Sequence, residues 1–256
     1  MTKTAADSLK KLCRLGAVAA FLAALVFRRN LGAAEIPLLL GQSPPDTVVG
    51  WFALLQSNPL LGLSFLNVFD LINYALVGIT FVALYVALRQ TSKRYMATAV
   101  AFGLAGIIVY FFSNQALPML NLSNQYANAA TQAQKSTLTA AGQALLSNGY
   151  NTNAVYPSIG IYLSLLFLAV AGFIISIVML RSKTFGKVGY VGIVASTLDL
   201  AYLVGLTFVP AECIGFLAAL CVATAGFLLM VWHLLIGLKL YKLSSRPKTM
   251  GGESSE

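Results

Sequence analysis

Charge is scarce in this sequence, since charged residues fill only 10% of its 256 positions, against about 25% in a typical soluble domain. Hydrophobic residues make up 58% of the chain, and the mean hydropathy is +0.79. A soluble chain of this length could not bury so much apolar surface. The composition therefore excludes a soluble domain. It predicts an all-α, polytopic transmembrane helical bundle, with residues 1–256 forming a single integral membrane domain.

Histidine and cysteine are also scarce, which limits metal and redox chemistry. A three-histidine zinc site is excluded because the chain has one histidine. The three cysteines are Cys13, Cys213 and Cys221. The last two lie about 12 Å apart along one predicted helix, which is too far for a disulfide bond. No ligand spacing points to a metal, so we expect no metal and no cofactor.

Familiar catalytic motifs are missing as well. The sequence contains no His-Glu-x-x-His, no Gly-x-Ser-x-Gly and no Gly-x-x-x-x-Gly-Lys-Ser/Thr pattern. Asp70 and Asp199 could pair as in an intramembrane aspartyl protease, but Leu198 stands where the presenilin-like motif has glycine. We therefore expect no catalytic residues and a protein that is not an enzyme. An intramembrane enzyme is the third and last hypothesis about function.

Six apolar runs are predicted to cross the bilayer. Runs two to six contain the roughly 20 residues that span the hydrocarbon layer. A spanning helix is apolar nearly all round, so periodicity gives no further help inside these runs. The predicted spans are residues 12–28, 60–88, 96–117, 158–180, 188–209 and 214–238.

The first run leaves two alternatives open. Its charge-free core covers residues 15–27 and follows Lys10, Lys11 and Arg14. This arrangement also fits a signal peptide with a cleavage site at residues 32–34. Against cleavage, Arg28 follows the apolar core directly and could extend toward the interface. We favour a retained first span.

Basic residues lie at alternate ends of the apolar runs. If the N-terminus is cytoplasmic, 14 of the 17 lysines and arginines fall on the cytoplasmic side. The positive-inside rule then predicts a multi-pass protein of the cell (cytoplasmic) membrane with both termini in the cytoplasm, including the tail 239–256. The net charge of +9 comes from these groups. We therefore expect the lipid bilayer as a partner, and no nucleic acid.

Two segments between spans are longer than turns and are predicted to be helical outside the cytoplasm. Residues 46–57 would begin at Asp46 as an N-cap, with Trp51 and Phe52 at the membrane interface. Residues 124–147 would form one helix that Ser123 caps and that ends near Gly149. That helix would run roughly 35 Å across the outer mouth of the bundle. A solvated connection and a lid over a binding site remain alternatives.

Several stretches carry a resemblance to a known family. They are LNVFDLINYALVG, the MLRS-x-x-F-x-K stretch that begins at Met179, VWHLLIGLKLYKL, and the polar segment from Ser113 to Leu146. The chain resembles, over about residues 10–245, an uncharacterised family of bacterial and archaeal multi-pass integral membrane proteins that is catalogued as a domain of unknown function. The resemblance implies six spans and no particular reaction. No functional residue can be transferred from it.

Two acids lie inside predicted spans. Counted along continuous helices, Asp70 and Asp199 both lie about 15 Å from the outer ends of their spans. Acids at this depth face the bundle interior and suggest a site. The proposed ligand or ion pocket adds polar neighbours from spans two and three to these acids. Its candidate residues are Asp70, Asp199, Asn67, Asn73, Asn114 and Gln115.

This pocket supports two further hypotheses about function. In the first, the protein binds or moves a small ligand, cation or proton, and two close carboxyl groups share a proton. In the second, it is a structural or partner-binding membrane protein whose polar groups only join helices. His233 is predicted to anchor the opposite interface beside Trp232. The sequence leaves the oligomeric state open.

Overall fold

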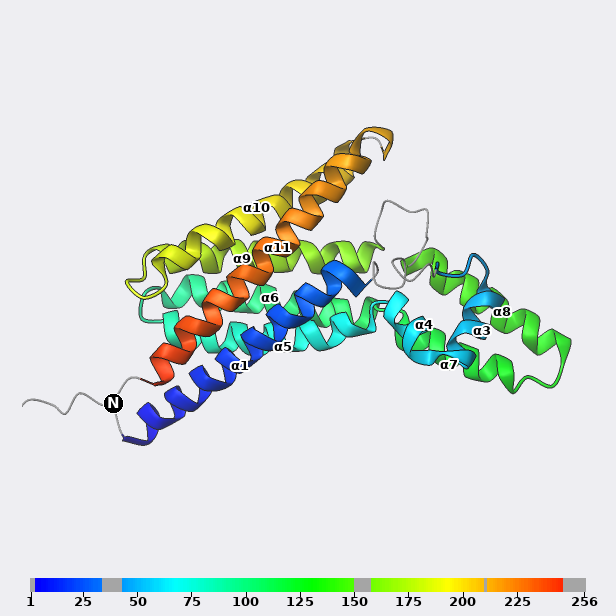
Figure 1. The fold of residues 1–256 in the computed structure, drawn as a ribbon, viewed down its shortest axis with the longest axis horizontal. Coiled ribbons are helices and arrows are strands. Elements are labelled where there is room, and N and C mark those ends of the chain that lie inside the picture. The colour runs from blue at the N-terminus through cyan, green and yellow to red at the C-terminus, as the bar shows by residue number, and fades with distance from the viewer. Residues whose placement is uncertain (1–2, 34–42, 150–157, 210, 246–256) are drawn as a thin grey trace, which may run out of the picture.

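The computed structural model describes residues 3–33, 43–149, 158–209 and 211–245, and the regular secondary structure of these residues is helical. Figure 1 shows an elongated molecule with a helical bundle at one end and a smaller group of helices at the other. The helices are α1 (Lys3–Ala33), α3 (Val48–Ser57), α4 (Pro59–Phe65), α5 (Val68–Leu88), α6 (Lys93–Ser113), α7 (Ala116–Ala127), α8 (Gln132–Gly149), α9 (Ile159–Leu180), α10 (Gly186–Phe208) and α11 (Ala211–Ser244).

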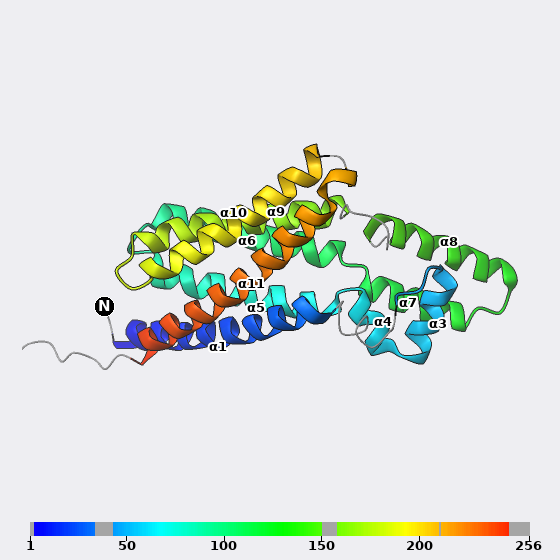
Figure 2. The same ribbon diagram turned by 45° about the horizontal axis from the view of Figure 1, so that its top comes forward.

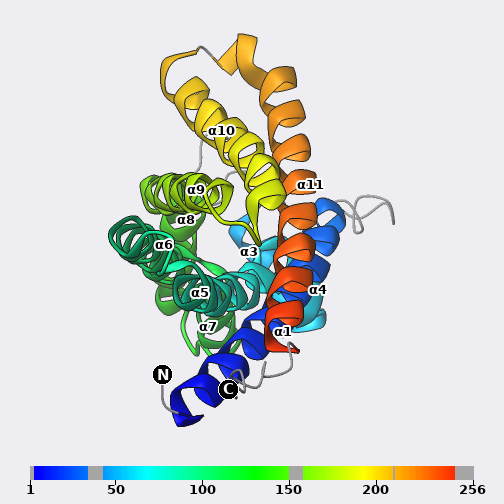
Figure 3. The same cartoon turned by 90° about the vertical axis from the view of Figure 1, so that its left-hand side faces the viewer.

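Six helices form the bundle and pack in a closed ring. Helix α1 packs on α5, which is followed around the ring by α6, α9, α10 and α11, and α11 returns to α1. Seen along the long axis, α1 and α11 lie on one side and α6 and α9 on the other (Figure 3). The ring brings the first and last helices of the chain together.

The helix lengths agree with the predicted membrane spans. Five helical segments are long and apolar enough to cross a membrane: residues 68–88, 93–127, 159–180, 186–208 and 223–244. The remaining predicted span lies in α1, whose charge-free core is shorter than the roughly 20 residues of a full span. Because Cys13, Ala17 and Ala20 of α1 belong to the bundle core, α1 packs as a full member of the ring. The chain is a helical membrane protein.

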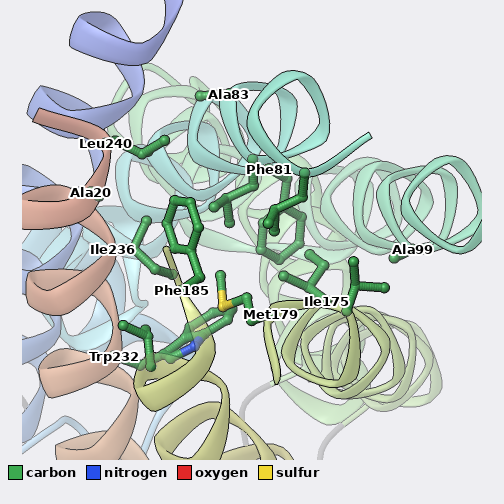
Figure 4. Packing of buried hydrophobic residues seen from close by; sticks show 14 of the residues in the cluster. Ala20, Phe81, Ala83, Ala99, Ile175, Met179, Phe185, Trp232, Ile236 and Leu240 are labelled. Atoms are coloured by element: carbon green, nitrogen blue, oxygen red, sulfur yellow. The ribbon is translucent and has the colours of Figure 1, made fainter. Parts of the chain in front are cut away.

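Large side chains fill the centre of the bundle, and small ones let the helices approach. Phe81 of α5, Trp232 of α11 and Phe185, the N-cap residue of α10, converge in the core (Figure 4). A Cβ added at Gly16 of α1 would collide with Ala83 of α5. Such close contacts between helices are how membrane bundles gain packing energy, because lipid offers no hydrophobic drive between apolar helices.

The predicted span 60–88 is wrong in one respect, because it is two helices. Helix α4 ends at Phe65 and α5 begins at Val68. Between them Asn67 has φ 59° and ψ 37°, a left-handed conformation that stops a right-handed helix. Asparagine tolerates this conformation better than most residues. The sequence does not predict this break, because the run is apolar on both sides of it.

Helices α3, α4, α7 and α8 form a lobe with its own hydrophobic core, and we call these four helices the lobe. It extends beyond the ends of α5 and α6 (Figures 1 and 2). Its core contains Trp51, Phe52, Leu55, Phe65 and Met119. The helix predicted at 46–57 is confirmed as α3, although Thr47 rather than Asp46 caps it. The interface position predicted for Trp51 and Phe52 is wrong, because both are buried inside the lobe.

The single helix predicted at 124–147 is wrong, because the segment is the hairpin of α7 and α8. The chain leaves the helix after Ala127, and the side chain of Gln134 accepts hydrogen bonds from the backbone N–H groups of Ala130 and Thr131. Ser123 is not a cap. It is buried in α7, where its hydroxyl donates to the carbonyl of Phe52 at 3.0 Å. Helix α8 is described as far as Gly149, and the predicted end near this residue stays a prediction.

The two ends of the bundle differ in charge. We call the end where α1 begins and α11 ends the terminal end, and the end that carries the lobe the lobe end (Figure 1). The basic residues that flank α5, α6, α9, α10 and α11 lie at the terminal end, because that is where α5 and α9 end and where α6 and α10 begin. These residues are Arg89, Lys93, Arg94, Arg181, Lys183, Lys187, Lys239 and Lys242.

Candidate functional site

A cavity of about 220 Å³ lies inside the bundle between α5, α9, α10 and α11. Helix α9 contributes aliphatic side chains and Gly172, while the other three helices contribute polar and aromatic groups. The lining residues are Tyr74, Val77, Phe81, Leu165, Leu168, Ala169, Gly172, Ser196, Asp199, Tyr202, Leu203, Gly226, Leu229, Trp232 and His233.

Asp199 is the acidic group of this cavity. It lies near the middle of α10, and Ser196 and Tyr202 lie three residues before and after it. Residues at this spacing share one face of a helix, so α10 directs three polar side chains into the cavity. Nothing in the described residues donates a hydrogen bond to the Asp199 carboxyl group. The carboxyl group is therefore available to a bound molecule.

Tyr74 connects the cavity to the second acid. Its ring packs on the ring of Tyr110, with 4.3 Å between centroids, and its hydroxyl is within electrostatic reach of both Asp70 and Asp199. The Tyr110 hydroxyl in turn donates a 2.9 Å hydrogen bond to Oδ2 of Asp70. The two acids thus lie near one tyrosine, but Asp199 lines the cavity and Asp70 is bound to α6.

The depth predicted for Asp70 rests on one continuous helix from Leu60, and the structure breaks that helix between α4 and α5. Asp70 lies in the first turn of α5, next to the break at Asn67. A negative charge in the first turn of a helix is favoured by the helix dipole. This position and the bond from Tyr110 give Asp70 a role in joining helices.

Two of the predicted site residues join the lobe to the bundle. The Asn114 side chain donates to the carbonyl of Asn67 at 3.2 Å and accepts from the N–H of Ala116 at 3.0 Å. These bonds tie the turn between α4 and α5 to the turn between α6 and α7. We call this region, around Asn67 and Asn114, the neck. Gln115 contributes only a local bond to the carbonyl of Ser113.

Asn73 belongs neither to the cavity lining nor to the neck. It is only 1% exposed, and its side-chain oxygen has no hydrogen-bond partner among the described residues. It is not among the residues that line the cavity. Of the six predicted site residues, therefore, the structure places Asp199 in the cavity, four at or next to the neck, and Asn73 in neither place.

The predicted interface position of His233 is wrong, since it lines the cavity and is 2% exposed. Its Nδ1 lies 2.9 Å from the carbonyl of Leu229, and its ring meets the edge of Trp232, with 5.1 Å between centroids. Helix α11 crosses the bundle obliquely (Figure 1), so counting residues from one end gave the wrong depth. The signal for a site was present, since Trp232 and His233 interrupt an otherwise apolar run.

The cavity contains several polar groups that the described chain does not satisfy. The indole N–H of Trp232 is buried without a hydrogen-bond partner in the described residues. The hydroxyls of Tyr74 and Tyr202 also have no hydrogen-bond partner among the described residues, and both side chains are partly buried. Buried polar groups normally find partners. These groups can donate to and accept from a small molecule held between α5 and α10.

Comparison with known proteins identifies a family. A family model described as a domain of unknown function (DUF4386) matches residues 12–237. No curated protein and no solved structure gives a significant match to the chain. The family confirms the resemblance seen in the sequence and assigns no reaction to the cavity.

Proposed function

We propose that this chain, which belongs to the DUF4386 family, is a non-enzymatic membrane protein that binds a small ligand in the cavity around Asp199. The observation that carries the proposal is the convergence of unsatisfied polar groups on one space inside the bundle. Asp199, Tyr74 and Tyr202 face a cavity of about 220 Å³ with no hydrogen-bond partner in the described chain. A fully buried polar group left unpaired costs about 1–3 kcal/mol; these three groups are partly buried, so a ligand would offset a part of that cost.

The size of the cavity limits the ligand. Sites for drug-sized molecules have volumes of about 300–1,000 Å³, so a cavity of about 220 Å³ suits a smaller molecule. The aliphatic residues Leu165, Leu168 and Leu229 favour a ligand with some apolar surface. The polar residues on α5 and α10 would fix its orientation.

Binding can be tested with purified protein in a maltoside detergent. The melting temperature is measured against a panel of small polar, charged and apolar molecules for the native chain, for Asp199→Asn and for Ala169→Leu, which fills part of the cavity. The control is Asp46→Asn, an exposed acid on the lobe. We expect at least one compound to stabilise the native chain and the control but neither cavity variant. A compound that stabilises all four equally would place binding elsewhere and refute the proposal.

Binding and movement are separated by a second measurement. The protein is reconstituted into liposomes, and uptake of the compound that binds is followed over time. Uptake that is lost in Asp199→Asn would make the protein a transporter. Binding without uptake would make it a receptor or sensor.

A structural role is the second candidate, and a specific observation favours it for part of the predicted site. Asp70 is bonded to Tyr110, and Asn114 is bonded to both connections of the neck. These groups already have partners, as polar groups that join membrane helices do. Under this candidate, changes at Asp70 and Asn114 alter stability without altering ligand binding.

The orientation is part of the proposal. The protein lies in the cytoplasmic membrane with its terminal end facing the cytoplasm and its lobe outside. The support is the gathering of flanking basic residues at the terminal end, which the positive-inside rule associates with the cytoplasmic side. This arrangement implies the lipid bilayer as a partner and gives no reason to propose nucleic acid as one.

A further inference from the structure

We infer that the ligand of the Asp199 cavity is a small organic cation, with an amine or quaternary ammonium head held between the carboxyl group and aromatic rings. This inference rests on the proposed function, because it concerns the same cavity. It adds the chemical class of the ligand, and three independent features of the lining support it.

The first feature is charge. The chain has a net charge of +9, but its flanking basic residues lie at the terminal end, away from the cavity. Among the described residues that line the cavity there is an aspartate and no lysine or arginine. Asp70 adds a second carboxylate within electrostatic reach of Tyr74. Asp199 is partly buried, and a carboxylate shielded from water is stabilised by a partner of opposite charge; here that charge would come from the ligand.

The second feature is the number of aromatic rings. Tyr74, Phe81, Tyr202, Trp232 and His233 all line the same cavity. Aromatic faces attract cations through their quadrupole, and sites for quaternary ammonium groups are built from several such rings. An aspartate surrounded by rings combines ion pairing with cation–π attraction. A neutral ligand of the same size would use only the apolar part of this lining.

The third feature is the lack of oxygen ligands for a metal ion. Hard cations such as Ca²⁺ require about six to eight oxygen ligands. The side chains lining the cavity offer the Asp199 carboxyl group and the hydroxyls of Tyr74, Ser196 and Tyr202, while the rest are mainly hydrocarbon and aromatic. An inorganic cation would lose its hydration shell without full replacement. An organic cation carries its own apolar surface and fits the aliphatic wall of α9.

The experiment compares choline with 3,3-dimethylbutan-1-ol, its neutral isostere in which carbon replaces the charged nitrogen. Sodium chloride at the same concentration controls for ionic strength. The native chain has two tryptophans, Trp51 in the lobe and Trp232 in the cavity. In a Trp51→Phe background, fluorescence therefore reports binding at Trp232 directly. Melting temperature in detergent is the second readout.

We expect choline to bind about tenfold or more tightly than the alcohol. In Asp199→Asn the affinity for choline should fall toward that of the alcohol, while Asp46→Asn behaves as the parent. If Asp199→Asn does not fold, Tyr202→Leu tests the same idea. Loss of that ring should weaken choline binding severalfold and leave the alcohol unchanged.

The failures of the two proposals are distinguishable. If the alcohol binds as well as choline and Ala169→Leu abolishes both, the cavity binds ligands but does not select cations, which overturns this inference alone. A response to sodium chloride equal to that of choline would indicate an inorganic cation and would also overturn it. If no compound of any class affects Trp232 fluorescence or the melting temperature, the proposed function itself fails.

Discussion

Tyr110 donates a 2.9 Å hydrogen bond to Oδ2 of Asp70, which joins the last turn of α6 to the first turn of α5. The bond lies next to the neck, where Asn67 and Asn114 connect the bundle to the lobe. Two successive links along the same pair of helices therefore hold the lobe end of α5 and α6 together.

The first prediction concerns this bond. Tyr110→Phe removes the donor and leaves a partly buried carboxyl group with one partner fewer, so the free energy of unfolding should fall by about 1–3 kcal/mol. The matched control is Tyr190→Phe, because Tyr190 is 67% exposed. Unfolding by a denaturing detergent, followed by circular dichroism, provides the measurement. Equal stability of the two variants would mean that the bond contributes nothing.

The second prediction concerns the neck. Asn114→Ala removes one bond to the carbonyl of Asn67 and another to the N–H of Ala116. Each such bond contributes about 1 kcal/mol, so the neck should open more often and amide exchange in residues 64–70 and 113–118 should accelerate. Hydrogen exchange followed by mass spectrometry checks this. Gln115→Ala is the neighbouring control, because among the described residues the Gln115 side chain bonds only to the carbonyl of Ser113. The same protection in both variants would refute the role of Asn114.

The third prediction concerns the close contact between α10 and its neighbours. A Cβ at Gly192 would collide with the hydroxyl of Ser176 and the indole nitrogen of Trp232. Gly192→Ala should therefore destabilise the bundle by about 1–3 kcal/mol through overpacking, and it should weaken ligand binding because Trp232 lines the cavity. At Gly186 the nearest atom to an added Cβ is the carbonyl oxygen of Leu180 at 3.7 Å.

Gly186→Ala is accordingly the matched control for Gly192→Ala. It adds the same methyl group to the same helix at an ordinary van der Waals distance from its nearest neighbour, so its melting temperature should equal or slightly exceed that of the native chain. If both glycines tolerate alanine equally, α10 does not pack as closely on Ser176 and Trp232 as described. Melting temperatures of the two variants, measured side by side in detergent, decide the question.

Much of the fold could be predicted from the sequence, because a spanning helix depends on length and apolar character. The predicted span 158–180 agrees with α9 at Ile159–Leu180, and 188–209 agrees with α10 at Gly186–Phe208. Hydropathy carries no information on backbone conformation, however. Hydropathy therefore does not predict the left-handed conformation of Asn67 inside an apolar run. It also does not predict the separate lobe, whose helix α4 ends just before Asn67.

The site was predicted only in part, for a related reason. Asp199 could be recognised because an acid in a spanning helix stands out from its surroundings. The sequence predicts an interface position for His233 beside Trp232, since residue counts cannot reveal that α11 is oblique. Asp70 was assigned to the same site as Asp199, because its bond to Tyr110 joins residues 40 positions apart and leaves no pattern in the sequence. Only the tertiary structure distinguishes polar residues of a ligand site from polar residues that join helices.

The last prediction concerns orientation. In a cysteine-free background, Lys135→Cys places a thiol on α8 of the lobe and Lys183→Cys places one between α9 and α10 at the terminal end. If the basic end faces the cytoplasm, a membrane-impermeant maleimide should label Lys135→Cys in intact cells and should label Lys183→Cys only after permeabilisation. Both side chains are at least partly exposed, so access to the thiol does not limit either reaction. The opposite labelling pattern would place the lobe in the cytoplasm. The ligand would then bind to a bundle whose orientation in the membrane is inverted.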